Sequence, residues 1–169
     1  MSSNDRELIK TWVLSSIAIK QLHLHQLDDG ARISVNADQI ANDMPRSMMA
    51  HVNVADDIIR SLYELKKHGY LEYINGEQEF ANFRITTNGI IFFKKYLAPI
   101  VSTINQGNYE KIIDNTEGDI AAKNELKAIK KNLKDKTEDQ VIEEFVKFGF
   151  KYGPTAIVLF MKLIESTQH

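Results

Sequence analysis

Residues 58–85 read IIRSLYELKKHGYLEYINGEQEFANFRI, and this stretch decides the fold. Its first part is predicted to be a helix, because apolar residues recur every three or four positions, at Ile58, Leu62 and Leu65. Gly69 follows basic residues and stands where a left-handed helix cap belongs. Two runs rich in aromatic and branched residues then flank Asn75-Gly76, a dipeptide typical of tight hairpin turns. The stretch therefore predicts a helix over Val54–His68 and a β-hairpin that turns at Asn75-Gly76.

Further elements are predicted on both sides of this stretch. Asn36 and Gln39 form a capping-box pattern, and Pro45 disfavours helical geometry at Met44, which should end the second helix. Asn53 is placed to cap the third helix. The expected elements are a helix over Asp5–Leu27, a very short strand at Ile33–Val35, a helix over Ala37–Met44 and, after the hairpin, a helix over Asn88–Leu97.

Residues 99–169 are predicted to form three or more helices, separated by residues that interrupt helical structure. Pro99 should kink or restart the preceding helix, Thr137 and Gln140 form another capping-box pattern, and Gly153-Pro154 interrupts the chain again. The aromatic and branched run Val141–Met161 needs a surface to pack against. A homodimer through these C-terminal helices is the most economical arrangement. A ligand pocket and packing within the chain are the alternatives.

The amino-acid composition limits the classes of protein to which the chain can belong. The 169 residues include no cysteine, so disulfides, a thiolate nucleophile and cysteine-based zinc sites are excluded, and a reducing, cytoplasmic location is expected. The N-terminus lacks the features of a secretory signal, and the apolar run Thr155–Met161 is too short to span a membrane. We therefore expect a soluble protein with no membrane partner.

No pattern of catalytic residues is present. His23 and His25 lie two residues apart, so on a helix their side chains point about 200° apart and do not share a metal. The sequence shows no glycine-rich phosphate loop, no nucleophile elbow and no recognisable Ser/His/Asp pattern. We expect no catalytic residue, no cofactor and no metal, and hence no enzyme.

Charge is nearly balanced along the chain. Up to Ala98 there are 11 basic and 12 acidic residues, and 10 and 11 follow, which makes the net charge −2. Neither half has the basic excess of an electrostatic clamp on nucleic acid. Asp56 and Asp57 stand in the first turn of the predicted third helix. They stabilise the helix through its dipole, mark a protein-binding surface that repels phosphate, or do both.

The order helix, tiny strand, helix, helix, hairpin, helix resembles that of the winged helix-turn-helix domain of bacterial and archaeal transcriptional regulators. The resemblance covers about residues 7–97. It is carried by Ile58–Leu71, with its Leu-rich helix, glycine and aliphatic strand, and by Phe83–Gly89, which is similar to a wing strand passing into a fourth helix. It implies a mainly α fold with a small β-hairpin wing: a winged helix-turn-helix domain over residues 1–98, then a helical segment over 99–169.

The resemblance also implies a function. Such a protein would bind double-stranded DNA as a homodimeric transcriptional regulator, with the third helix (54–68) in the major groove and the wing (70–86) on the backbone. The residues implied in DNA contact are Arg46, Asn53, Arg60, Ser61, Lys67 and Arg84. The sequence departs from the family in the longer stretch between Met44 and Gly69 and in an acidic hairpin tip. The alternative is therefore a protein–protein interaction module that uses the acidic third helix and does not bind DNA.

Overall fold

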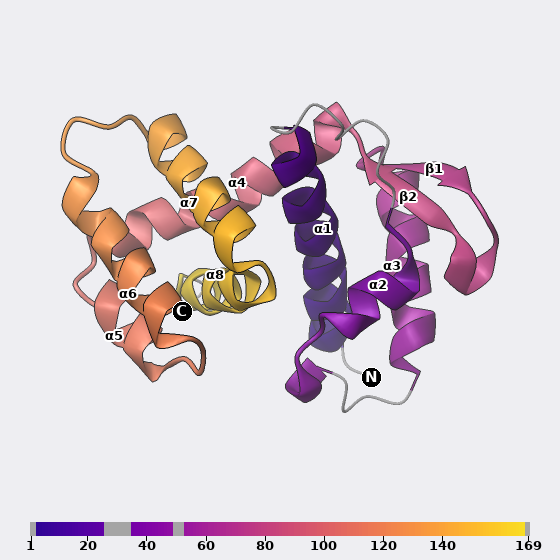
Figure 1. Cartoon of the computed structure of the whole chain (residues 1–169), viewed down its shortest axis with the longest axis horizontal. Helices are drawn as coiled ribbons and strands as arrows, with labels where there is room; N and C mark the ends of the chain where they lie inside the picture. The colour runs from indigo at the N-terminus through magenta and orange to yellow at the C-terminus, as the bar shows by residue number, and fades with distance from the viewer. Residues whose placement is uncertain (1–2, 26–34, 49–52, 168–169) are drawn as a thin grey trace. The chain divides into compact units, whose positions relative to one another are not determined.

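The computed structural model describes residues 3–25, 35–48 and 53–167. The protein is mainly helical, with one two-stranded antiparallel sheet (Figure 1). It divides into two compact units, a front unit of residues 1–93 and a rear unit of residues 94–169, so the division falls slightly before the boundary expected after residue 98. Within the described ranges, no helix is both long and apolar enough to cross a membrane.

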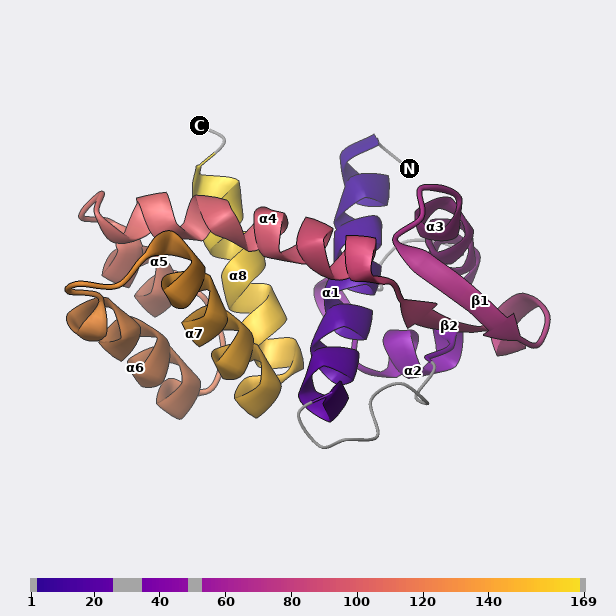
Figure 2. The same cartoon turned by 90° about the horizontal axis from the view of Figure 1, so that it is seen from above.

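The front unit is built around two long helices and a hairpin. Helix α1 packs against α3, and the β1–β2 hairpin lies beside α3 (Figures 1 and 2). Its largest fully buried side chains include Trp12, Ile17, Ile58, Leu62 and Phe83. The elements in chain order are α1 (Ser3–His25), α2 (Ala37–Asn42), η2 (Arg46–Met48), α3 (Val54–Lys67), β1 (Leu71–Asn75), η3 (Gln78–Phe80), β2 (Asn82–Ile85) and the start of α4 (Thr87–Ile104).

Several predicted helix boundaries differ from those found: α1 begins at Ser3 rather than Asp5, α3 ends at Lys67 rather than His68, and α4 spans Thr87–Ile104 rather than Asn88–Leu97. Asn36 and Gln39 do form a capping box, but α2 ends at Asn42, and the N–H of Met44 donates to the Ala41 carbonyl in a tighter final turn. Asn53 precedes α3 as expected but makes no side-chain cap, because its φ of 70° places it in the left-handed region rather than in the extended backbone of a capping residue. Leu27, the expected end of the first helix, lies outside the described residues.

The predicted pairing of the two strands is confirmed, with Leu71 opposite Ile85 and Tyr73 opposite Phe83. The predicted two-residue turn is wrong. Asn75 pairs with Asn82, and η3 lies in the longer connection between them. Gly76 has a φ of 85°, and a Cβ there would clash with the Phe80 carbonyl, so the glycine serves a wider turn than Asn-Gly usually makes.

Val35 adds a third segment to the hairpin. Its N–H donates to the Phe83 carbonyl at 2.8 Å, and the N–H of Phe83 returns a bond to the Val35 carbonyl at 3.0 Å. Both side chains are fully buried. Of the short strand expected at Ile33–Val35, the described part is Val35, which forms an isolated β-bridge to Phe83, whereas Ile33 and Ser34 lie outside the described residues.

Helix α4 does not restart at Pro99, so this one of the two outcomes expected there is wrong. It continues to Ile104, so the hydrogen bond that proline cannot donate is lost without ending the helix. Leu97, Ile100 and Ile104 are buried on either side of the proline. Burial of these side chains outweighs one missing backbone bond.

The rear unit contains the remainder of α4 and four further α-helices. The capping box at Thr137 and Gln140 and the break at Gly153-Pro154 are confirmed. Phe145, Phe148 and Phe160 are buried in the single chain, with Phe145 and Phe160 ring centroids 6.0 Å apart. The further elements are α5 (Tyr109–Asn115), α6 (Ile120–Ile129), η4 (Lys130–Asn132), α7 (Glu138–Tyr152) and α8 (Pro154–Ser166).

Candidate nucleic-acid interface

The outer face of α3 is the surface that the sequence assigns to DNA. The helix is strongly amphipathic: Ile58, Leu62 and Leu65 are buried, and polar side chains occupy the opposite side. Its exposed charged side chains are Asp56, Arg60, Glu64, Lys66 and Lys67. Three of these five are basic, so the exposed face of α3 is slightly positive although the helix as a whole carries a third acid.

That third acid, Asp57, faces away from the exposed surface. Its side chain is only 9% exposed, and its Oδ2 is buried without a hydrogen-bond partner among the described residues. Asp56, one residue before it, is exposed. The helical rotation of about 100° per residue separates the two carboxylates. Of these two aspartates, only Asp56 therefore opposes a phosphate on the outer face of α3, where Glu64 is also exposed.

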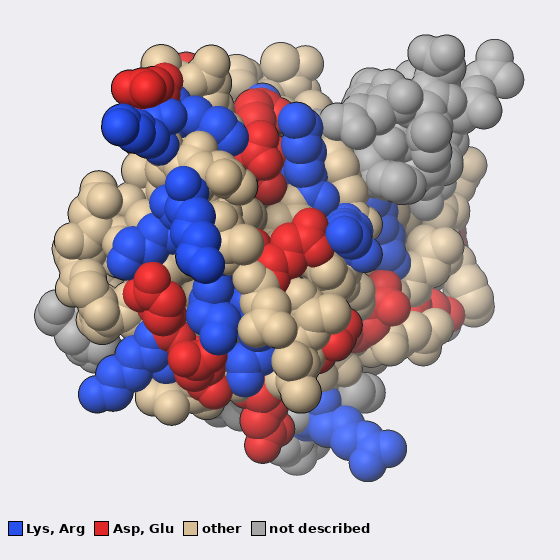
Figure 3. Space-filling view, turned by 60° about the vertical axis from the view of Figure 1, so that its left-hand side comes forward, with Lys and Arg blue, Asp and Glu red and all other residues tan. Residues whose placement is uncertain are grey.

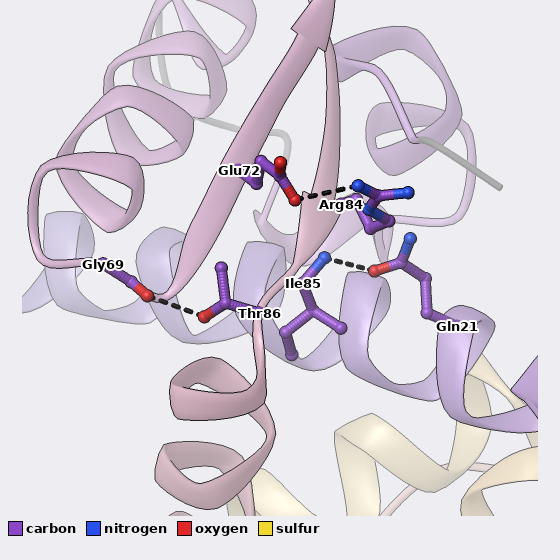
Figure 4. Close-up of polar contacts among 6 residues, drawn as sticks. All are labelled: Gln21, Gly69, Glu72, Arg84, Ile85 and Thr86. Carbon is purple, nitrogen blue, oxygen red and sulfur yellow. Dashed lines mark hydrogen bonds and ion pairs between the residues drawn. The ribbon is translucent and has the colours of Figure 1, made fainter. Parts of the chain in front are cut away.

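Figure 4 shows three polar contacts of the hairpin, two of which connect it to other parts of the front unit. The Gln21 side-chain carbonyl on α1 accepts from the backbone N–H of Ile85. The Thr86 hydroxyl donates to the carbonyl of Gly69 at 2.6 Å, and the Arg84 guanidinium meets the Glu72 carboxylate across the strands at 2.9 Å. The first two contacts connect β2 to α1 and to the segment after α3, which positions the hairpin beside that helix.

The six residues implied in DNA contact do not share one environment. Arg46, Asn53, Arg60 and Lys67 are exposed. Neither Arg46, Arg60 nor Lys67 makes an ion pair within the described part of the chain. Ser61 is buried, on the side of α3 that carries Asp57. Arg84 is half-buried, and Glu72 offsets its charge.

An aromatic cluster between α3 and the hairpin is a feature that sequence reasoning missed. The Tyr63 ring meets the buried Phe83 ring edge-on at 5.3 Å, and Tyr73 meets the same ring at 5.9 Å. The Lys66 ammonium lies 5.8 Å from the Tyr73 ring centroid, within the range of a cation–π contact. Near the hairpin turn, Phe80 is 63% exposed. The signal available in the sequence was one aromatic residue in each strand, Tyr73 and Phe83.

The rear unit has a different distribution of charge. Lysines gather along α6 and η4, yet acids of α5 face several of them: Lys127 Nζ lies 2.7 Å from Asp114 Oδ1, and Lys130 Nζ lies 3.1 Å from Glu110 Oε1. Figure 3 shows Lys and Arg interleaved with Asp and Glu on the face that it presents. This interleaving does not produce the single-sign surface that non-specific DNA binding favours.

Perturbed pKa values occur in the rear unit. Hydrogen bonds from Tyr152 and Lys151 lower the pKa of Glu125, and the bond to Glu125 raises the pKa of Tyr152. The backbone and Lys130 lower the pKa of Glu110. Burial raises the pKa of Tyr96 and of Tyr109, whose hydroxyl donates to the Leu126 carbonyl at 2.6 Å. These shifts follow from ion pairs and burial and bring no acid–base pair together in a cavity.

Among the described residues, no group of three or more His, Asp or Glu side chains is arranged to hold a metal ion. The side chains of His23 and His25 are not among those described.

Comparison with known proteins adds no relative: no protein-family model, curated protein or solved structure matches this chain.

Proposed function

We propose that the front unit is a winged helix-turn-helix domain and that the protein is a DNA-binding transcriptional regulator. The observation that carries the proposal is the pairing of Val35 with Phe83. It places Val35, located between α1 and α2 in the chain, in a β-bridge against the second strand of the hairpin. A helix, this bridge, two helices and a two-stranded wing then follow in an order that resembles that of a winged helix. This likeness is one of fold, and the DNA-binding function is an analogy drawn from it.

In this proposal α3 enters the major groove and the β1–β2 hairpin lies along the backbone. Arg60 and Lys67 on α3, with Arg46 in η2, supply positive charge at exposed positions. Ser61 is buried and Arg84 is paired with Glu72, so they contribute less to the surface available in this structure. Because one protomer offers few unpaired basic side chains, high affinity requires two copies.

The proposal therefore includes a homodimer formed through residues after Pro99. The buried aromatic side chains of α7 and α8 already pack within the single chain, so the interface must use other surface residues. Ile120, at the start of α6, is 74% exposed and is one apolar side chain available to it. Light scattering tests the assembly: the full-length chain should be dimeric at micromolar concentrations, and a monomer would remove this part of the proposal. Because a regulator must share a compartment with DNA, the proposal places the protein in the cytoplasm.

The test of DNA binding is an anisotropy titration of the full-length chain with mixed-sequence duplexes, followed by selection from a random library. Binding should be measurable at about 50 mM salt and should fall steeply toward about 200 mM, because neutralised phosphates release counterions. Selected duplexes should then bind more tightly than mixed sequence. A folded protein that binds no duplex at low salt would disprove the proposed function.

The second candidate is a winged-helix module that binds another protein. The observation that favours it is the exposed apolar surface of the hairpin: Phe80 is 63% exposed, and Tyr73 and Ile74 are each more than a third exposed. Apolar and aromatic side chains are enriched in protein interfaces, whereas phosphate contacts need basic ones. In this candidate, Phe80→Ser abolishes partner binding. Its effect on DNA binding should be small if the first proposal holds.

A further inference from the structure

A hollow of about 360 Å³ lies between α1 and α3 in the front unit. It arises because residues spaced by three or four positions on each helix face the same way. Every side chain that lines it is polar, and all but one carry a charge. The lining residues are Arg6, Glu7 and Lys10 from α1, and Asp57, Arg60, Ser61 and Glu64 from α3.

The Asp57 carboxylate is the unusual group in this hollow. It is nine-tenths buried, and its Oδ2 has no hydrogen-bond partner among the described residues. Leaving a buried acceptor unpaired destabilises a protein, and a charged acceptor does so more than a neutral one. Ser61 lies one helical turn away and lines the same hollow. A donor that entered the hollow would therefore satisfy an acceptor that the protein leaves unpaired.

Of the three basic side chains in the hollow, one pairs with acids of the protein, and two form no ion pair within the described residues. Lys10 Nζ lies 3.5 Å from Glu64 and 3.9 Å from Glu7, so it offsets both of these acids. Arg6 and Arg60 line the hollow and form no ion pair within the described residues. The hollow thus offers one buried anionic group and two cationic groups that form no ion pair with the residues that the structure describes.

We propose that this hollow binds a free α-amino acid. The ammonium group meets the Asp57 carboxylate and the Ser61 hydroxyl, and the carboxylate meets the guanidinium groups of Arg6 and Arg60. A simple anion would leave Asp57 unpaired, and a simple cation would face two arginines. A ligand that carries both charges on adjacent groups satisfies both sides. The volume of the hollow is at the small end of the range for ligand sites, about 300–1,000 Å³, which suits a small metabolite.

A ligand panel on the full-length chain tests the site without any DNA. The twenty standard amino acids are screened by thermal shift, and the ligands found are measured by calorimetry. At least one should raise the melting temperature. Its amide, which lacks the carboxylate, and its N-acetyl form, which lacks the ammonium, should each bind about tenfold more weakly or worse. Failure of all twenty to bind the folded chain would overturn the proposal.

Matched variants then identify the hollow. Asp57→Asn and Arg6→Gln should each weaken binding about tenfold or more, whereas Asp56→Asn, which neutralises the exposed neighbouring acid, should leave it unchanged. Asp57→Asn keeps the shape of the side chain, and circular dichroism checks that it folds. Affinity that survives both Asp57→Asn and Arg6→Gln would place the ligand elsewhere and contradict the assignment. Neither result depends on whether the protein binds DNA.

Discussion

Asp56 and Asp57 are consecutive residues in the first turn of α3, yet Asp56 is exposed on the outer face of the helix and Asp57 lines the hollow against α1. The two carboxylates share a favourable position near the positive end of the helix dipole. The two carboxylates differ in their surroundings. Asp56 faces solvent, and with it any phosphate that approaches α3, whereas Asp57 is shielded by the packing of the two helices.

This difference predicts effects of different size on DNA binding for two otherwise similar substitutions. Asp56→Asn should strengthen DNA binding about two- to fivefold at low salt, because it removes a negative charge from the proposed DNA face. Asp57→Asn should change DNA binding less. Anisotropy titrations of both variants at low and physiological salt measure the effect, which should shrink as salt rises. Equal effects of the two substitutions would show that α3 does not approach DNA by its outer face.

The unpaired basic residues of the front unit give a second prediction. Lys67→Ala should weaken DNA binding and reduce the slope of log affinity against log salt by about one, as expected for a lost phosphate contact. Arg84→Ala should have a smaller effect, because Glu72 already offsets the Arg84 charge. Lys131→Ala is the matched control, since Lys131 is an exposed lysine of the rear unit. A control that weakens binding as much as Lys67→Ala would argue against an interface on α3.

The local elements of the front unit were predictable because each depends on neighbours in sequence. The stripe Ile58, Leu62 and Leu65 and the capping box at Asn36 are set by spacings of three or four residues. The hairpin pairing was also predictable from its two apolar runs. Its turn was not, since Asn75-Gly76 commonly closes a two-residue turn, and here the chain continues into η3 before β2 begins.

The hollow was beyond sequence reasoning for a different physical reason. The spacings of Arg6 with Lys10 and of Asp57 with Ser61 and Glu64 show that each set shares one face of its helix. They do not show that these two faces meet, because that depends on how α1 packs against α3. The burial of Asp57 follows from the same packing. For this reason the sequence alone did not distinguish the exposed Asp56 from the buried Asp57.

Gly89 provides a test of the packing at the start of α4. A Cβ at this position would clash with the Tyr70 carbonyl and would lie 2.6 Å from Ile85 Cγ1, so the backbone of α4 approaches the hairpin as closely as only glycine permits. Gly89→Ala should destabilise the protein by about 1–3 kcal/mol. Gly118→Ala is the control, because its Cβ would meet only Thr155 Cγ2 at an ordinary 3.5 Å. Chemical denaturation monitored by circular dichroism distinguishes them, and equal stability of the two variants would contradict the close packing described.

The Glu125 contacts predict a dependence of stability on pH. Hydrogen bonds from Tyr152 and Lys151 lower the Glu125 pKa below its ordinary value of 4.5 in the folded state. A carboxyl with a lowered folded pKa stabilises the fold above its unfolded pKa, and this contribution is lost as pH falls through the folded value. Glu125→Gln should therefore lower the melting temperature at neutral pH, and the difference from wild type should shrink below about pH 4.5. Glu117→Gln, at an exposed loop position, is the control and should show no such trend.

Arg60 connects the two proposals, since it is exposed on the proposed DNA face of α3 and also lines the hollow. If a bound amino acid engages the Arg60 guanidinium, less of its charge is available to a phosphate, and DNA affinity should fall. Linkage requires the reverse effect to be equal, so saturating DNA should weaken amino-acid binding by the same factor.

Competition titrations with the amino acid that the panel identifies measure both directions. Arg60→Gln should weaken both ligands and remove most of the coupling between them. Lys67→Ala should weaken DNA alone, because Lys67 does not line the hollow. Two ligands that bind without affecting each other would show that Arg60 contacts at most one of them. The DNA titration and the amino-acid panel would still test each binding site separately.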